Sequence, residues 1–208
     1  MNRLNFYIDW FYKEADRQTS LNESLNIPIG ILTVVFGLLF FMFANFSFSL
    51  EENVTIEMLF LLFLVITSVL GVAVILYLFA SYIGFFTGNG YKALPVPYKL
   101  NKQYKELEQY IEENKQLLDK NITADSIYEE QLMEMLSDYI DYNVETNDRK
   151  MSYLYRAKQL LFVCVISVML CAIPFSIHFY SNKEKENVQK IEIHNLYEIL
   201  NSKKQNIK

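Results

Sequence analysis

The chain has 208 residues, of which 52% are hydrophobic and 21% are charged, and its formal net charge is −5. A length of this order suggests one domain or two small ones. The apolar residues gather in long uncharged runs, which excludes an ordinary water-soluble domain. The acidic balance argues against a general nucleic-acid binder.

The first segment, residues 1–26, is predicted to hold an amphipathic helix over Asn2–Gln18. Leu4, Ile8 and Phe11 share one face at spacings of three and four residues. Trp10 suits the headgroup region of a bilayer, so we expect this helix to lie in the membrane interface. The alternative is a helix that packs on the protein's own loop domain.

Three apolar segments, Pro28–Leu50, Ile56–Phe86 and Leu160–Tyr180, are each long enough to cross a bilayer, which takes roughly 20 residues. The first two form a tight hairpin (residues 27–90), and the third covers residues 159–180. The sequence therefore predicts an all-α membrane protein with three transmembrane helices.

The first span carries small residues at intervals of seven, Gly30, Gly37 and Ala44, which we expect to form a helix-packing stripe within or between chains. The alternative is that these glycines are scattered without meaning. Phenylalanines on the same span are expected to close a pore by dewetting: Phe36, Phe40 and Phe43. Glu57, at the start of the second span, is expected either to ring the mouth of a cation pore or to be an interfacial acid at a helix N-terminus.

Residues 91–158 are predicted to form a cytosolic helical hairpin. Its first helix follows Tyr98 and reaches about Lys120. After a turn capped by Thr123 or Ser126, with Ser126 and Glu129 as a capping box, the second helix is expected to continue through the third span and to end at Pro174. Residues 181–208 are predicted to be a polar tail with a modest helix over Val188–Leu200.

Lysine and arginine placement predicts the orientation. The Glu51–Thr55 loop has no basic residue, whereas ten lie between Lys92 and Lys158. Basic loops stay on the cytoplasmic side. We therefore expect a multi-pass protein of the bacterial inner membrane with a cytoplasmic N-terminus and an external tail, although that tail carries six lysines.

Residues that could carry chemistry are few. Cys164 and Cys171 lie in the third span, where they are expected to be buried apolar residues and not a disulfide or zinc site. His178 and His194 have no neighbours suited to metal binding, and no nucleotide-binding or hydrolase motif is present. We expect no enzyme activity, no cofactor and no metal.

Two basic edges flank the hairpin, with tyrosines between the cations. Cationic side chains that bind phosphates, together with aromatic rings on which bases stack, are typical of sites that bind an oligonucleotide or a nucleotide. The alternative is contact with anionic lipids. The candidate ligand-binding residues are Lys99, Lys102, Asn143, Asn147, Arg149 and Lys150.

Three short motifs carry a family resemblance: Arg17…Leu21-Asn22…Leu25…Ile27-Pro28-Ile29-Gly30, then Tyr91-Lys92-Ala93-Leu94-Pro95, and Tyr142-Asn143…Asn147…Arg149-Lys150…Leu154. Over most of residues 17–160 the chain resembles small multi-span membrane effectors of bacterial antiphage systems, of the Hailong and SLATT-like kind. The resemblance implies a homo-oligomer, taken as a tetramer, that depolarises the membrane in antiviral defence. It also implies control by a partner nucleotidyltransferase or its oligonucleotide product.

The sequence thus favours an oligomeric ion-conducting membrane effector. The alternative is a non-catalytic membrane anchor whose cytosolic hairpin recruits a soluble partner. A transporter fits less well, because no charge lies in the middle of a span.

Overall fold

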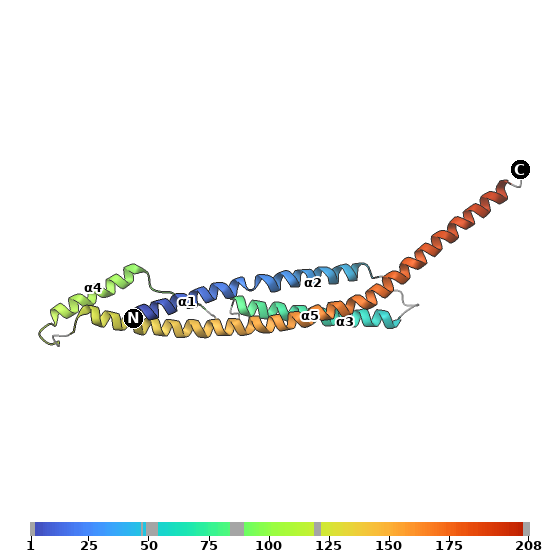
Figure 1. Ribbon diagram of the computed structural model, residues 1–208. Helices are drawn as coiled ribbons and strands as arrows, with labels where there is room; N and C mark the ends of the chain where they lie inside the picture. The colour runs from blue at the N-terminus through green and yellow to red at the C-terminus, as the bar shows by residue number, and fades with distance from the viewer. Residues whose placement is uncertain (1–2, 47, 49–53, 84–89, 119–121, 206–208) are drawn as a thin grey trace. The chain divides into compact units, whose positions relative to one another are not determined.

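The computed structural model describes residues 3–46, 48, 54–83, 90–118 and 122–205, with side chains omitted for residues 182 and 184–205. Every regular element in this part of the chain is a helix (Figure 1). The helices are α1 (Arg3–Glu23), α2 (Asn26–Ala44), α3 (Val54–Ile83), α4 (Pro97–Glu113) and α5 (Ala124–Gln205).

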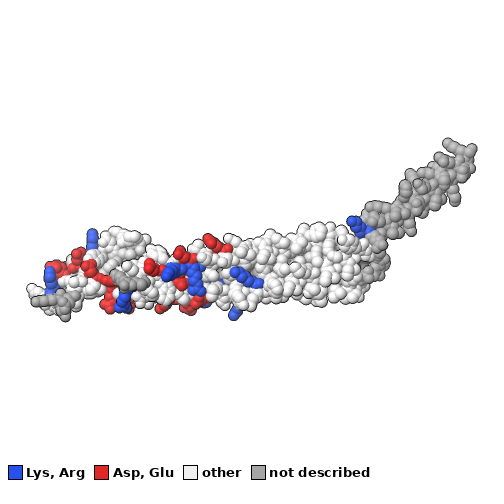
Figure 2. All heavy atoms as spheres, in the orientation of Figure 1, with Lys and Arg blue, Asp and Glu red and all other residues white. Residues whose placement is uncertain are grey.

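Three stretches are long and apolar enough to cross a membrane: Arg3–Ala44, which contains α2, then α3, and α5 as far as Ser181. The prediction of an all-helical protein with three such helices is confirmed. In Figure 2 a long stretch of the surface has neither acidic nor basic side chains. This agrees with an α2 that has no charged residue and an α3 whose only one is Glu57.

The chain divides into two compact units. The α1 unit comprises Met1–Ile27 and Leu76–Arg156, and so holds α1, the end of α3, α4 and the first part of α5. The α2 unit comprises Pro28–Ile75 and Ala157–Lys208, and so holds α2, most of α3 and the rest of α5.

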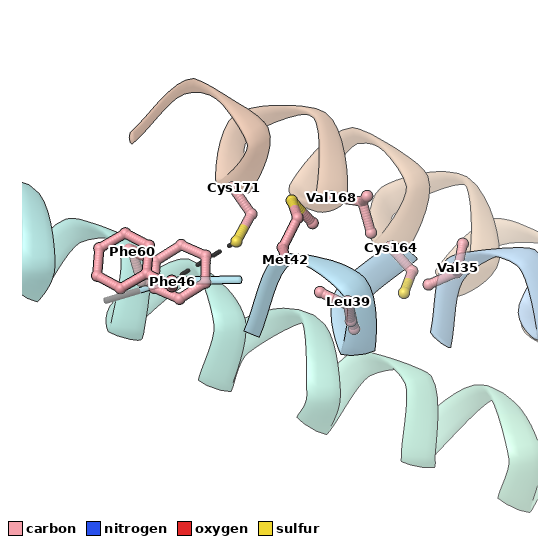
Figure 3. Packing of buried hydrophobic residues seen from close by; sticks show 8 residues of the cluster. All are labelled: Val35, Leu39, Met42, Phe46, Phe60, Cys164, Val168 and Cys171. Carbon is pink, nitrogen blue, oxygen red and sulfur yellow. Dashed lines mark hydrogen bonds between the residues drawn. The ribbon is translucent and has the colours of Figure 1, made fainter. Parts of the chain in front are cut away.

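The α2 unit is a helical bundle whose buried positions recur every three or four residues. On α2 these are Leu32, Val35, Leu39 and Met42; on α5 they are Ala157, Leu161, Cys164, Val168 and Cys171. An average spacing of 3.5 residues keeps one seam of each helix against its neighbours, as in left-handed coiled coils. Figure 3 shows the resulting core, in which the Cys171 thiol points at the Phe60 carbonyl with the sulfur 3.9 Å from the oxygen.

Helix α5 is longer than the sequence predicted. We expected it to end at Pro174, but it continues as one helix to Gln205. Residues Val188–Leu200 are helical as predicted, but they are part of α5 and not a separate helix. Proline removes one backbone hydrogen bond and disfavours the preceding turn. Long apolar helices tolerate this where neighbouring groups pack around the break, and Pro174 is buried.

Helix α4 is shorter than predicted and ends at Glu113, where the Asn114 side chain donates to the Tyr110 carbonyl at 2.8 Å. The start of α5 carries a reciprocal cap between Thr123 and Ser126, each backbone N–H lying 3.2 Å from the other's hydroxyl oxygen. Thr123 as the cap is confirmed, and the capping box at Ser126 and Glu129 is wrong. The Thr123 hydroxyl already accepts a hydrogen bond from the Ser126 N–H, so Thr123 is the N-cap and Ser126 is the third residue of α5.

The apolar face of α1 packs within the chain. Phe11 is buried together with Leu136 and Ile140 of α5, and Leu4 and Ile8 lie against this cluster. This is the alternative that the sequence left open for α1, because the residues expected to dip into lipid are covered by α5. Phe6 and Trp10 remain exposed on the opposite side.

Candidate functional site

In the α1 unit the buried seam of α5 changes from apolar to polar. After Leu136 and Ile140, the next buried residues of α5 are Asn143, Thr146, Asn147 and Lys150, which we call the polar seam. The first three have no exposed surface. Buried polar groups are costly unless they are hydrogen-bonded. The partners of Asn143 and Asn147 therefore define a constrained polar region.

Asn147 is the centre of this region. Its side-chain Nδ2 lies 2.8 Å from the Glu14 carboxylate, 3.0 Å from the Glu14 carbonyl and 2.7 Å from the Tyr91 hydroxyl. The Tyr91 hydroxyl in turn donates to the Glu14 carbonyl at 2.6 Å. Three segments that are distant in sequence are thus joined by one amide, and we call Glu14, Tyr91 and Asn147 the Asn147 network.

The Asn147 network constrains the ionisation of its members. Burial raises the pKa of Tyr91 above its ordinary value, since a phenolate there would lose hydration, and the bond from Asn147 opposes this. Arg17 donates hydrogen bonds to both Asp148 and Glu14, and the bond to Asp148 is the largest of the causes that raise the pKa of the guanidinium. Arg17 thereby supplies positive charge beside the buried Glu14.

Asn143 makes a second link, to the backbone that follows α3. Its Oδ1 accepts from the Lys92 N–H at 3.0 Å and its Nδ2 donates to the Lys92 carbonyl at 3.1 Å. The Lys92 ammonium lies 5.3 Å and 5.0 Å from the ring centres of Tyr139 and Tyr142, within cation–π range. This pairing holds the backbone at Lys92 against α5.

Lys150 is the member of the polar seam whose charge is not compensated. Its backbone carbonyl accepts from Ser81 of α3 at 3.0 Å, but its ammonium forms no hydrogen bond or ion pair with the described residues. Burial lowers its pKa. Three other polar atoms on α5 are fully buried and have no hydrogen-bond partner among the described residues: Thr146 Oγ1, Asn147 Oδ1 and Arg149 Nε.

The structure separates the predicted ligand-binding residues into two groups. Asn143, Asn147 and Lys150 lie in the buried seam, with Arg149 beside them and 3.9 Å from Glu145. Lys99 and Lys102 lie on exposed α4, where Lys102 pairs with Glu106 at 3.6 Å. There an open groove of about 300 Å³ is lined by Tyr98, Asn101, Lys102, Lys105, Glu106 and Gln109.

The predicted pore and packing residues also fall into two groups. Phe40 and Phe43 are 74% and 51% exposed on α2, whereas Phe36 packs inside the α2 unit against Gly71 of α3. Gly30, Gly37 and Ala44 face away from the chain's own bundle. A Cβ built on Gly30 or Gly37 meets nothing within 4 Å.

Glu57 is buried at the start of α3, one turn before Phe60. Phe60 stacks on Phe46 with ring centres 4.0 Å apart, and Phe46 stacks on buried His178 at 4.2 Å. One turn beyond Phe63, Thr67 shares a hydrogen bond of 2.7 Å with Ser167 of α5. Thr67, Ser167 and His178 are thus buried in this bundle, and Glu57 is not an exposed surface acid.

Sequence reasoning missed Glu14, Tyr91 and Ser81 as members of the polar region. The motifs that carry the family resemblance did contain two pairs that are hydrogen-bonded in the structure, Tyr91 with Asn147 and Lys92 with Asn143. Comparison with family models, curated proteins and solved structures gave no match.

Proposed function

We propose that the protein is a membrane effector that assembles with further copies of itself into an ion-conducting pore. The observation that carries this proposal is the outward position of the small-residue stripe on α2. Gly30 and Gly37 have open space where a side chain would stand. Exposed glycines in a membrane helix allow the backbones of two helices to approach closely, which is a main route to helix association in lipid.

The packed interior of the single chain also favours conduction between chains over conduction through one chain. The described core of the α2 unit is filled by apolar side chains, among them Val35, Leu39 and Phe60. The hydroxyls of Thr67 and Ser167 satisfy each other there. A water-filled path therefore has to run between chains, where Phe40 and Phe43 would form an apolar constriction that gates by dewetting.

Under this proposal, regulation of the pore acts through the Asn147 network. It ties α1, which leads directly into α2, to α5 and to the segment after α3. The family resemblance supports an inner-membrane location, a cytoplasmic N-terminus, a role in antiphage defence and control by a nucleotide or oligonucleotide. Under this proposal, a signal that loosens the network would change how α2 packs in the oligomer.

Ion flux tests the proposal directly. Full-length protein in liposomes should release a potassium gradient, and cells that express it should depolarise, as measured with a voltage-sensitive dye. Phe40→Ser should increase the leak. The matched control is Phe162→Ser, at a residue of α5 that is also exposed, at 69%. If the wild-type protein and both variants pass no ions and cells stay polarised, the pore proposal is wrong.

A second candidate, a membrane anchor that recruits a soluble partner, is favoured by α4. None of its residues is buried, and Tyr98 and Tyr110 are 77% and 57% exposed. Exposed tyrosines between charged residues are common at protein interfaces. Absence of flux together with loss of function in Tyr98→Ala would favour this candidate over the pore.

A further inference from the structure

The uncompensated cation in the polar seam is the feature that the Asn147 network does not explain. Lys150 is 5% exposed, and no acidic side chain in the described part of the chain pairs with it. The aliphatic part of the side chain is buried, but Nζ is not among the fully buried polar atoms without a partner, so the ammonium reaches solvent, where a bound anion would pair with it.

Two further donors accompany this ammonium on the same side of α5. Thr146 precedes Lys150 by four residues and Arg149 by three, so the three side chains are neighbours on the helix surface. Thr146 Oγ1 and Arg149 Nε are buried and have no hydrogen-bond partner among the residues that the structure describes.

The Thr146 hydroxyl lacks the hydrogen bond that a helical threonine usually makes. Thr19, Thr33 and Thr67 all donate to the carbonyl four residues earlier in their own helices, which is the usual outcome for a helical threonine. Thr146 does not, although it is fully buried. Its hydroxyl is thus free to donate to a ligand.

We propose that Lys150, Thr146 and Arg149 form an anion site that takes up a phosphate group, carried either by a lipid headgroup or by a soluble phosphate compound. Phosphate oxygens accept several hydrogen bonds at once, and charge-assisted bonds from lysine and arginine are the strong ones. Asn147 Oδ1, which is buried nearby and also has no partner in the described part of the chain, is an acceptor and is not part of this site.

The surroundings admit both sources of phosphate. Ser81 bonds to the Lys150 carbonyl, and the residues that follow it on α3, Tyr82 and Ile83, are 61% and 52% exposed. Tyrosine beside exposed apolar surface is typical of the headgroup region of a membrane. A soluble phosphate compound would bind through the same donors. The inference rests on the proposed function only for what the binding regulates.

Thermal unfolding of the full-length protein in a maltoside detergent tests the site without measuring conduction, so its outcome is separate from that of the pore proposal. The probes are phosphatidylglycerol, with phosphatidylcholine as the lipid control, and inorganic pyrophosphate, with sodium chloride at matched ionic strength. A ligand that binds the folded state raises the unfolding midpoint with its concentration. We expect a shift on the order of 5 °C at saturation for the wild-type protein.

Lys150→Met should weaken this binding at least tenfold, and Thr146→Val by about threefold, while Lys150→Arg should retain most of it. Lys13→Met, at an exposed lysine of α1, is the matched control and should bind as the wild type does. Lys150→Met keeps the buried aliphatic part of the side chain and should fold, so its loss of binding can be measured.

A shift with phosphatidylglycerol that Lys150→Met abolishes assigns the phosphate to lipid. The same result with pyrophosphate assigns it to a soluble compound. If neither probe stabilises the wild-type protein, or if both stabilise Lys150→Met equally well, Lys150 only extends its ammonium to solvent and the proposed site does not exist.

Discussion

Gly71 and Gly37 offer a direct comparison between a glycine that the fold requires and one that it does not. A Cβ placed on Gly71 of α3 would lie 2.7 Å from Cζ of Phe36 on α2. Carbon atoms in contact normally stand about 3.5–4.0 Å apart, so the ring would have to move by about 1 Å. A Cβ on Gly37 meets nothing within 4 Å.

We expect Gly71→Leu to destabilise the single chain and Gly37→Leu to leave it intact. Overpacking of this kind costs typically about 1–3 kcal/mol. Gly71→Ala should cost less, because only the far end of the Phe36 ring has to shift. Leucine at Gly37 improves helix propensity by up to about 1 kcal/mol and introduces no clash. Its effect should fall on assembly, since it fills the stripe through which copies are proposed to meet.

The assay combines thermal unfolding in detergent with size-exclusion chromatography and light scattering in mild detergent. Gly71→Leu should lower the unfolding midpoint by several degrees, and the double variant Phe36→Ala with Gly71→Leu should recover part of the loss because the ring is gone. Gly37→Leu should shift the protein to smaller oligomers. Equal destabilisation by Gly71→Leu and Gly37→Leu would refute the assignment of the two helix faces.

Further predictions concern the polar seam and the topology. Asn147→Ala and Glu14→Ala should each cost about 1–3 kcal/mol in unfolding free energy, and the double variant less than their sum, as a double-mutant cycle would show; simple additivity would contradict the contact. Because the pKa of Lys150 lies below its ordinary 10.5, the unfolded chain binds more protons as pH approaches that value, so stability should rise there relative to Lys150→Met. The measurement is the difference in unfolding free energy between the wild-type protein and Lys150→Met as a function of pH, in which the opposing contribution of tyrosine titration cancels. A difference that does not change with pH would contradict the lowered pKa of Lys150. A cysteine at Asn53 should react with an impermeant reagent in intact cells and one at Lys115 only after lysis; the reverse pattern would invert the topology.

The sequence by itself determined that the protein is helical and has three stretches able to cross a membrane, because the length and apolarity of a segment decide this without reference to its neighbours. It did not determine which face of each apolar helix lies inside. Helices such as α2 are apolar on every side, so their composition carries no amphipathic signal. Only the tertiary structure shows that Leu32, Val35 and Leu39 face the bundle while Gly30 and Gly37 face outward.

The polar region divides in the same way. The sequence marked Asn143, Asn147, Arg149 and Lys150 as unusual polar residues on one helix, and the structure buries three of them. Glu14 was not marked, because an acid on a surface-like helix resembles any solvated charge until its neighbour is known. It becomes part of a site only when α1 packs on α5 and Asn147 meets its carboxylate at 2.8 Å. Contacts between residues 133 positions apart are decided by packing, which no local pattern records.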